Sequence, residues 1–398
     1  MKANRNEEKG MLFDLNKELL VQKNAEFTVS EIKQQPATWQ KTAGIIEENF
    51  KELDQFVNEV LSHKNYRIIF SGAGTSEFVG NTLIDVLRKR YNFRVESIAT
   101  TLIVSNPDLY FDKETPTLLV SFGRSGNSPE SIGAVEHAEA IVDTLYHLVI
   151  TCNAEGELAK FKSDKSKVFA INLPEETHDK AFAMTSSYTN MVLAAYLALT
   201  LDNFETNKKV VKQLGDLGEL FVNDKVKTVE KIVQDFNFER IVYLGSNNHK
   251  GLAQESGLKM LELTTGEVVS LHDTSLGFRH GPKSFLNDKT LVVLYTSQDE
   301  YTQRYDQDLF NEIINGQVAK VLVVTTKKYE ENYSNADYLI VYDTPLNDEL
   351  LGLVYVMTAQ SFSALKSVAL NKTPDNPFPT GMVNRVVEGV TLYDYQGE

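Results

Sequence analysis

The chain of 398 residues has one cysteine, one tryptophan, ten prolines and no long apolar run. The lone Cys152 excludes an intramolecular disulfide and indicates a reducing compartment. The longest apolar stretch, Met191 to Leu201, has about half of the roughly 20 residues that a membrane crossing needs, so it predicts a buried helix. Acidic residues stand near the N-terminus, where an export signal needs an apolar run. We therefore expect a cytoplasmic protein with no membrane partner.

Basic residues are also scarce, with 40 Lys and Arg against 55 Asp and Glu, which gives a net charge of −15. Such a charge argues against nucleic acid as a partner, because binding a polyanion needs a broad basic surface. It leaves open a small anion held by a local arrangement of donors. The seven histidines are scattered and no thiolate or histidine pair has metal-ligand spacing, so we expect no metal and no cofactor.

The candidate strands of the first half recur in the second half at an almost constant interval. Short β-branched segments begin at positions 67, 95, 117, 147 and 167, and similar segments begin at positions 240, 268, 290, 320 and 338. Four of the five intervals are 173 residues and the fifth is 171. Helical patterns separate the segments, which is typical of βαβ units and a parallel sheet. One such match could arise by chance, but four in one register favour a duplication over a single ten-stranded sheet.

The sequence thus predicts two tandem α/β domains, each a five-stranded parallel sheet with helices on both faces in a flavodoxin-like three-layer arrangement. We expect a helical lead-in over residues 1–45, a first domain over 46–203, a charged helical linker over 204–236 and a second domain over 237–398. In the lead-in, Thr28 and Glu31 have the spacing of a capping box, in which each side chain bonds a backbone N–H at a helix start.

Two loops that follow predicted strands of the first domain have the features of a phosphate site. They are SGAGTSE, with Gly74, Thr75 and Ser76, and SFGRSGNSPE, with Arg124, Ser125, Gly126 and Ser128. Glycine allows close backbone approach, hydroxyls and a guanidinium bind phosphate oxygens, and Pro129 after Ser128 places a helix N-terminus there. Glu77 stands where a dinucleotide fingerprint needs a small residue, so that motif is incomplete. Turn and cap chemistry explains either loop alone, but explains less well both loops at adjacent strand ends.

A third hydroxyl cluster, MTSSYTN, contains Thr185 and Ser186 and follows the fifth predicted strand. Contacts to sugar hydroxyls and simple capping of the next helix are equally compatible with this pattern.

Candidates for an acid and a base lie in the second domain. Glu255, Lys259 and Glu262 are spaced i, i+4, i+7 and share one face of a predicted helix. The helix pattern alone favours a solvated charged face with an ordinary Glu–Lys pair. His280 stands in the segment RHGP on a stiff turn, and by itself it is slightly better explained as a loop histidine than as an acid/base group.

Three of these segments together resemble the signature segments of the sugar isomerase (SIS) family. They are SGAGTSE, SFGRSGNS and LKMLELTTGEVVSLHDTSLGFRHGP, and the likeness covers about Thr28 to Tyr395. The tandem arrangement is similar to the isomerase half of glucosamine-6-phosphate synthase. With the lead-in EIKQQPATW, the whole is most similar to the AgaS subfamily of galactosamine-6-phosphate deaminase/isomerases, which includes tagatose-6-phosphate ketose/aldose isomerase-like proteins.

The resemblance assigns roles to the candidate residues. It implies that Thr75, Ser76, Ser125 and Ser128 hold the phosphate of a sugar, with Arg124 in place of a family glutamine. Glu262 would move a proton between sugar C1 and C2, with Lys259 one turn before it. His280 would open the sugar ring from the neighbouring subunit, which implies a homodimer with shared active sites.

The C-terminal segment departs from the synthase pattern. Where the synthase has a lysine near its sugar, the alignment places Glu388, and Arg385 is the nearest cation and a candidate for substrate binding. Because no glutamine amidotransferase domain precedes the SIS pair, the resemblance implies ammonia release or simple isomerisation. We expect conversion of galactosamine 6-phosphate to tagatose 6-phosphate and ammonia through ring opening and an enolamine. A non-deaminating aldose–ketose isomerase, a non-catalytic sugar-phosphate sensor and a gluco-configured substrate stay open here.

Overall fold

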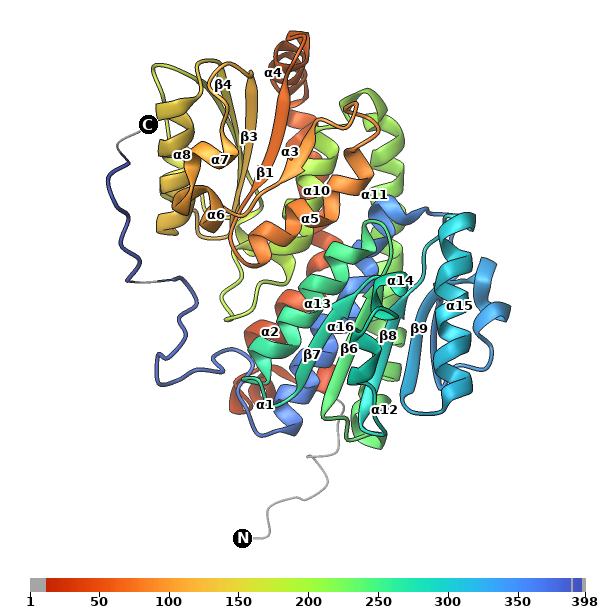
Figure 1. The fold of residues 1–398 in the computed structure, drawn as a ribbon. Coiled ribbons are helices and arrows are strands. Elements are labelled where there is room, and N and C mark those ends of the chain that lie inside the picture. The colour runs from red at the N-terminus through yellow and green to blue at the C-terminus, as the bar shows by residue number, and fades with distance from the viewer. Residues whose placement is uncertain (1–11, 388, 396–398) are drawn as a thin grey trace.

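Two five-stranded parallel sheets form the frame of the molecule in a computed structural model that describes residues 12–387 and 389–395 (Figure 1). Their strand orders are β2-β1-β3-β4-β5 and β7-β6-β8-β9-β10, which are the same order within each half. The first sheet contains β1 (Arg67–Ser71), β2 (Val95–Ser97), β3 (Thr117–Gly123), β4 (Leu145–Thr151) and β5 (Lys167–Asn172). The second contains β6 (Arg240–Gly245), β7 (Val269–Asp273), β8 (Thr290–Tyr295), β9 (Lys320–Thr326) and β10 (Tyr338–Tyr342). The prediction of two tandem α/β units, each with a five-stranded parallel sheet, is confirmed.

Helices on the outer face of each sheet form two outer layers. On the first sheet these are α6 (Thr100–Ser105), α7 (Pro107–Tyr110), α8 (Pro129–Ile141) and α9 (Glu157–Lys160). On the second they are α14 (Ser275–Phe278) and α15 (Glu300–Gly316). Apolar residues of both strand faces are buried, as expected for a parallel sheet covered on both sides.

The inner layer is shared by both sheets. It contains α2 (Glu26–Lys33), α3 (Gln35–Glu48), α4 (Phe50–Ser62), α5 (Thr75–Leu87), α10 (Ser186–Ala198), α11 (Phe204–Leu220), α12 (Val226–Asp235), α13 (His249–Leu263) and α16 (Asp348–Ala369), after a short α1 (Lys17–Gln22). One continuous hydrophobic core joins these helices to the inner faces of the two sheets. Figure 1 shows α5, α10, α13 and α16 between the sheets. The two halves therefore fold against each other, with the predicted linker segment packed on α3 and α16.

The apolar segment that begins at Met191 is a buried helix, as predicted. It forms the larger part of α10, in which every residue is buried. Among the described residues, no helix combines the length and the apolar character that crossing a membrane requires.

The capping box predicted at Thr28 and Glu31 is wrong. Thr28 lies inside α2, and Ala25 is the residue that precedes the helix. The Thr28 hydroxyl donates to Asp375 Oδ1 at 2.7 Å, and a Glu31 carboxylate oxygen accepts from the amide of Ala181 at 3.2 Å. Partners distant in the sequence have replaced the local cap, which no local pattern could indicate.

Helix α13 of the second half lies directly against α5 of the first half at Gly251. A Cβ atom on Gly251 would lie 2.5 Å from the amide nitrogen of Thr82 and 2.6 Å from the carbonyl carbon of Asn81. One turn further along α13, Asn81 Nδ2 donates to Gln254 Oε1 at 2.9 Å across the same contact. The backbone approach sets the distance between the loop before α5 and the charged face of α13.

The close approach predicts an asymmetric effect of two glycine substitutions. Gly251→Ala should lower the free energy of unfolding by about 1–3 kcal/mol, because its methyl group meets backbone that cannot yield without separating the helices. Gly44→Ala in α3 is the matched control, because a Cβ there meets nothing within 4 Å. It should stabilise by up to about 1 kcal/mol through helix propensity. Chemical denaturation of both variants measures the difference, and equal effects would contradict this account of the contact.

Candidate active site

The two predicted phosphate loops lie side by side at the carboxyl ends of β1 and β3. These two strands pair side by side in the sheet, and Ser71 lies opposite Ser121. The β1 loop turns into α5 through Gly74, whose φ of +57° is a left-handed conformation that favours glycine. The β3 loop turns at Gly126, with φ of +66°, where a Cβ would lie 3.2 Å from Thr151 Oγ1. Glycine at both positions lets the loops converge on one point.

A small cavity of about 110 Å³ lies between these loops. Its walls combine the loops, the first turn of α8, Met184 and the C-terminal segment. The lining residues are Ala73, Ser76, Phe122, Gly123, Arg124, Ser125, Gly126, Ser128, Glu130, Ser131, Met184, Arg385, Val386 and Val387. We call this cavity and its two loops the cradle. Five of the candidate residues predicted from the first-domain loops, together with Arg385, line it.

Arg124 is buried beneath the cradle and bonds backbone carbonyls. Its Nη1 donates to the Phe182 carbonyl at 2.9 Å and its Nη2 to the Arg385 carbonyl at 2.6 Å. Burial, and then the nearby Arg385 cation, lower the pKa of Arg124 to about 10. The guanidinium therefore remains charged at neutral pH. It contributes positive potential while its hydrogen bonds hold the C-terminal segment in place.

The C-terminal segment crosses from the second half to the first over the mouth of the cradle. The Arg385 Nε donates to the Ala181 carbonyl at 3.2 Å, and its terminal nitrogen bonds the Asp179 carbonyl. Further along, the Tyr395 ring packs edge-on against His137 of α8 with ring centres 5.3 Å apart. Figure 1 shows this segment running along the first half toward α8. Glu388, the residue aligned with the synthase lysine, lies outside the described residues.

The hydroxyl cluster before α10 is organised by a buried carboxylate. Asp179 accepts from the amide of Thr185 at 2.7 Å and from the hydroxyl of Ser187 at 2.6 Å, and it also bonds the Ser186 hydroxyl. Ser186 Oγ additionally accepts from Gln34 Nε2 at 2.9 Å. Thr185 Oγ1 is buried and has no hydrogen-bond partner among the described residues. In this arrangement Ser186 serves the local structure, and Met184 is the residue of the cluster that reaches the cradle wall.

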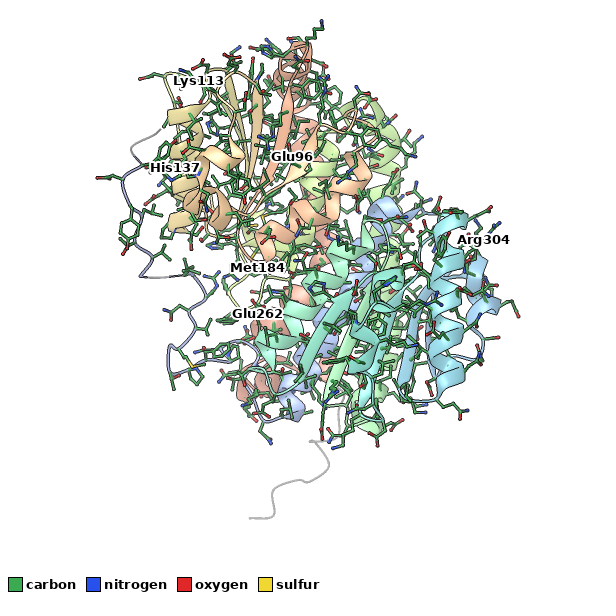
Figure 2. All side chains as sticks on the ribbon, viewed as in Figure 1. Glu96, Lys113, His137, Met184, Glu262 and Arg304 are labelled. Atoms are coloured by element: carbon green, nitrogen blue, oxygen red, sulfur yellow. The ribbon has the colours of Figure 1, made fainter. Side chains whose placement is uncertain are left out.

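Lys259 of α13 links the second half to the cradle. Its ammonium donates to Thr75 Oγ1 at 3.0 Å and to Glu262 Oε2 at 2.5 Å, and it lies 3.4 Å from Glu255 Oε1. Lys259 and Glu255 are fully buried, whereas the Glu262 side chain is 23% exposed. Figure 2 places Glu262 and Met184 where the two halves meet. The helix pattern alone predicted a solvated face, and this prediction is wrong because α5 covers the face.

Burial shifts the pKa values of the charged groups around Lys259. Desolvation raises the pKa of Glu255 to about 8, although the Lys259 cation opposes that rise. Burial alone would lower the pKa of Lys259, but the two neighbouring carboxylates outweigh it and raise the pKa above its usual value. Lys259 thus stays protonated, and its two hydrogen bonds connect the Glu262 carboxylate to Thr75 of the cradle loop.

His280 lies apart from this group. It follows α14 in an exposed turn, where its amide donates to the Gly277 carbonyl at 2.9 Å. Within the described part of the chain, no hydrogen bond or ion pair joins His280 to Glu262 or Lys259. The structure brings together the predicted cradle residues, Lys259 and Glu262, and it leaves His280 on the surface of the same half.

Sequence reasoning missed the buried acids that support the cradle. Glu31, whose pKa burial and then Asp179 raise to about 8, bonds the backbone at Ala181, next to the carbonyls that hold Arg124. Asp179 shapes the turn at Thr185. The lone acid in the segment THDKAFAMTSS was a weak signal for Asp179, because an Asp shortly before hydroxyl residues can cap them.

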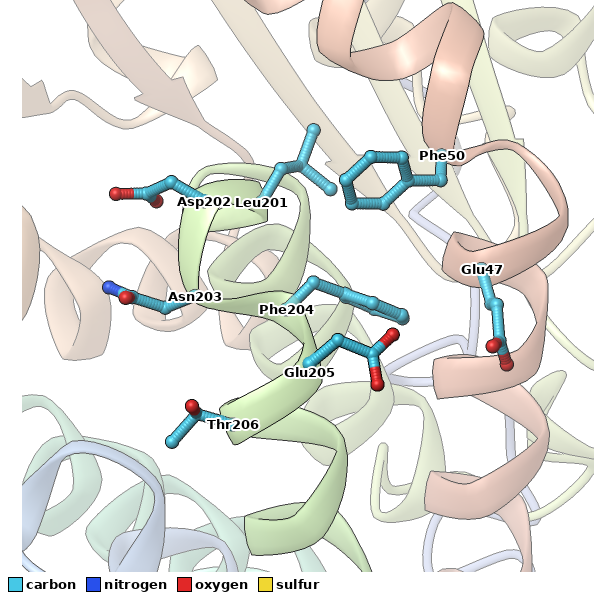
Figure 3. Close-up of a pocket in the computed structure, with 8 residues that line it drawn as sticks. All are labelled: Glu47, Phe50, Leu201, Asp202, Asn203, Phe204, Glu205 and Thr206. Atoms are coloured by element: carbon cyan, nitrogen blue, oxygen red, sulfur yellow. The ribbon is translucent and has the colours of Figure 1, made fainter.

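A second hollow, of about 510 Å³, lies away from the strand ends, between α3, α4 and the start of α11 (Figure 3). Two of its three carboxylates, Glu47 and Asp202, are paired with Lys208 and Arg90. It offers no hydroxyl-rich loop and no glycine turn.

Two α/β halves that place a hydroxyl-rich cradle beside an oriented carboxylate define a protein of the sugar isomerase class. The chain belongs to the SIS domain family, whose model matches residues 60–201 and 236–369. It is an enzyme of the SIS type.

Similar proteins cover almost the whole chain. The chain is 40% identical to the D-galactosamine-6-phosphate deaminase AgaS of Shewanella sp. (strain ANA-3), over 96% of this chain and 95% of that protein. The structure resembles a candidate tagatose-6-phosphate ketose/aldose isomerase from Clostridium novyi, with a TM-score of 0.92 and 42% identity over 97% of this chain and 100% of that one. It also resembles the tagatose-6-phosphate ketose/aldose isomerase of Escherichia coli, with a TM-score of 0.85 and 35% identity over 93% and 97% of the two chains.

The raised pKa of Glu255 predicts how stability depends on pH. Because its folded-state pKa lies above the unfolded value, its contribution to stability is present at low pH and is lost as pH rises toward about 8. Glu255→Gln should therefore gain stability relative to the wild type between about pH 5 and 8, by at most about 1.4 kcal/mol per pH unit. Urea denaturation across this range measures the effect. Glu239→Gln, at a carboxylate whose side chain is 56% exposed, should show no such trend. If the difference in unfolding free energy between Glu255→Gln and the wild type does not change with pH, the raised pKa of Glu255 is contradicted.

Proposed function

We propose that the protein is a deaminating aldose–ketose isomerase that converts galactosamine 6-phosphate and water to tagatose 6-phosphate and ammonia. The observation that carries this proposal is the position of Lys259, which bonds both Thr75 in the cradle and the Glu262 carboxylate. A sugar whose phosphate occupies the cradle then has its carbon chain directed toward Glu262. The relative named D-galactosamine-6-phosphate deaminase supports an amino sugar as the substrate.

The phosphate is held by the first half. Ser76, Ser125 and Ser128 offer hydroxyls, and the loop amides with the N-terminus of α8 offer backbone donors. Arg124 and Arg385 add positive charge from below and from the C-terminal segment. Gly74 and Gly126 allow close backbone approach. Thr185 and Ser186 stay candidates for contacts to sugar hydroxyls, with the unpartnered Thr185 Oγ1 the better placed donor.

Proton transfer is the task of His280 and Glu262. His280 moves a proton between the ring oxygen and O1 to open the sugar. Glu262 takes the C2 proton, which gives an enolamine, and returns it at C1, which gives a ketimine. Water hydrolyses the ketimine to the ketose and ammonia. The Lys259 ammonium donates a hydrogen bond to the Glu262 carboxylate and so orients it for proton transfer.

His280 reaches the reaction from the other subunit of a homodimer in this proposal. Its exposure and its separation from Glu262 within one chain support this arrangement. Leu261, Val269 and Leu276 are exposed apolar residues on α13, β7 and α14, and they offer a surface for such a contact.

Plain aldose–ketose isomerisation is the second candidate, favoured by the names of the two structural neighbours. It would use the same residues and release no nitrogen. Purified protein incubated with galactosamine, glucosamine and tagatose 6-phosphates, with ammonia and ketose measured separately, distinguishes the two. Ammonia from galactosamine 6-phosphate supports deamination, and ketose interconversion without ammonia supports isomerisation. Binding of a sugar phosphate without turnover would favour a sensor.

Removal of the base should lower turnover far more than substrate affinity. Glu262→Gln keeps the size and the hydrogen bond to Lys259 but cannot take a proton, so kcat should fall about 10²–10⁴-fold with KM little changed. Steady-state kinetics on the substrate that the wild type turns over measures this. Glu267→Gln, at a half-exposed carboxylate shortly after α13, is the matched control and should keep wild-type kinetics. Near-normal kcat in Glu262→Gln would remove Glu262 from the mechanism.

Shared active sites predict complementation between two inactive variants. Glu262→Gln and His280→Ala proteins, unfolded together in equal amounts and refolded, should regain about a quarter of wild-type activity. Half of the dimers are then mixed, and each mixed dimer contains one intact site. Each variant refolded alone sets the background. Activity that stays at the background while mixed dimers are detected would place His280 and Glu262 of one chain in the same site.

A further inference from the structure

The second half carries loops equivalent to the cradle, and they raise the question of a second anion site. β6 and β8 end at Gly245 and Tyr295, as their counterparts β1 and β3 end in the first half. The interval of 173 residues makes Ser297 the counterpart of Arg124 and Gln298 the counterpart of Ser125. Parallel sheets with the same strand order bring these loops together at one point, as in the first half.

In the second half these loop donors are occupied by carboxylates of the chain itself. Asp348, the first residue of α16, accepts from the amide of Gln298 at 2.6 Å and also bonds the Ser297 hydroxyl. Asp306 of α15 accepts from the amide of Ser297 at 2.9 Å and from the hydroxyl of Ser246 at 2.8 Å. Asp306 is fully buried, whereas Asp348 is half-buried at the edge of the loop.

The first half shows the opposite arrangement. Among the described residues, no Asp or Glu carboxylate accepts a hydrogen bond from residues 123–128. Within residues 12–387 and 389–395, the hydroxyl of Ser128 bonds only that of Ser131, at 2.6 Å. Apart from the Arg124 guanidinium and the Asn127 amide, which bond acceptors of the protein, the donors of that loop are left for an acceptor from outside it. Buried or half-buried donors need an acceptor, and the two halves meet that requirement from different sources.

We propose that Asp348 and Asp306 are built-in anions that fill the second cradle, so that the chain accepts phosphate in its first half only. Two carboxylates at the loop supply the acceptor oxygens that a phosphate would supply. They also repel any dianion that approaches, since like charges at a shared site oppose each other. The duplicated fold thereby keeps one sugar-phosphate site for each pair of domains.

Removal of the half-buried carboxylate should open a phosphate site. In full-length Asp348→Ala, the Gln298 amide and the Ser297 hydroxyl lose their acceptor, so the Tm in chloride should be lower than that of the wild type. Inorganic phosphate at equal ionic strength should raise the Tm of this variant more than that of the wild type. Equilibrium dialysis should find one more phosphate bound per chain than in the wild type. Glu349→Ala is the control, because it removes the same charge at the neighbouring, exposed residue. Its Tm rise in phosphate and its phosphate stoichiometry should match those of the wild type.

A folded Asp348→Ala protein with the phosphate response and stoichiometry of the wild type would overturn the proposal. If Asp348→Ala does not fold in chloride, Asp348→Ser provides a hydroxyl at the start of α16 while still leaving space for the anion. If neither variant folds in chloride, the yield of refolding in phosphate against chloride decides. A gain specific to phosphate supports the built-in anion, and equal yields contradict it. Because every result is a difference from the wild type, it does not depend on whether the first cradle binds the proposed substrate.

Discussion

The buried ammonium of Lys259 is the interaction on which the arrangement of the site depends. A charge removed from water must have partners, and Lys259 finds them on both sides of the junction between the halves, at Thr75 in α5 and at Glu255 and Glu262 in α13. A shift of α13 relative to α5 would break the hydrogen bond from this cation to Thr75, while Glu255 and Glu262 on its own helix would move with it. Gly251 allows the approach, and the Lys259–Thr75 hydrogen bond favours it. The helices are thereby held at the distance at which Lys259 bonds both Thr75 of the cradle loop and Glu262.

The common inner layer explains how a duplicated chain came to have unequal halves. Both sheets pack on one core of helices, so neither half can change its inner face alone. The loops at the carboxyl ends of the strands are free of that constraint and have diverged. In the first half they keep glycines and hydroxyls, and in the second they bond Asp306 and Asp348. In the proposed mechanism, α13 of the second half supplies the base, Glu262. The two halves then share one proposed composite site in place of two identical ones.

The sequence allowed all ten strands and both cradle loops to be predicted, because β-branched runs and glycine turns are local patterns. The repeated interval then related the strands of the two halves. What it could not indicate arises from contacts between distant segments. The face of Glu255, Lys259 and Glu262 looked solvated because α5, which covers it, lies more than 160 residues away. Thr28 and Glu31 had local capping geometry but bond Asp375 and Ala181. Arg124 was expected to point at a phosphate, whereas its guanidinium bonds the carbonyls that anchor the C-terminal segment.

The net charge of −15 is compatible with an anionic ligand because charge in this protein is separated by burial. Most carboxylates lie at the surface, where water and salt screen them. Arg124 and Lys259 are buried near the cradle, where a lower effective dielectric strengthens their field several-fold. Near Arg124, the carboxylates of Asp179 and Glu31 are held by backbone donors. The carboxylates nearest Lys259 are Glu255 and Glu262 on its own helix. A phosphate at the cradle therefore meets the cations Arg124 and Arg385 in its walls, with a single carboxylate, Glu130, among the described residues that line it, and a screened negative surface at long range. The distribution of the charges, and not their sum, determines which anion the protein can hold.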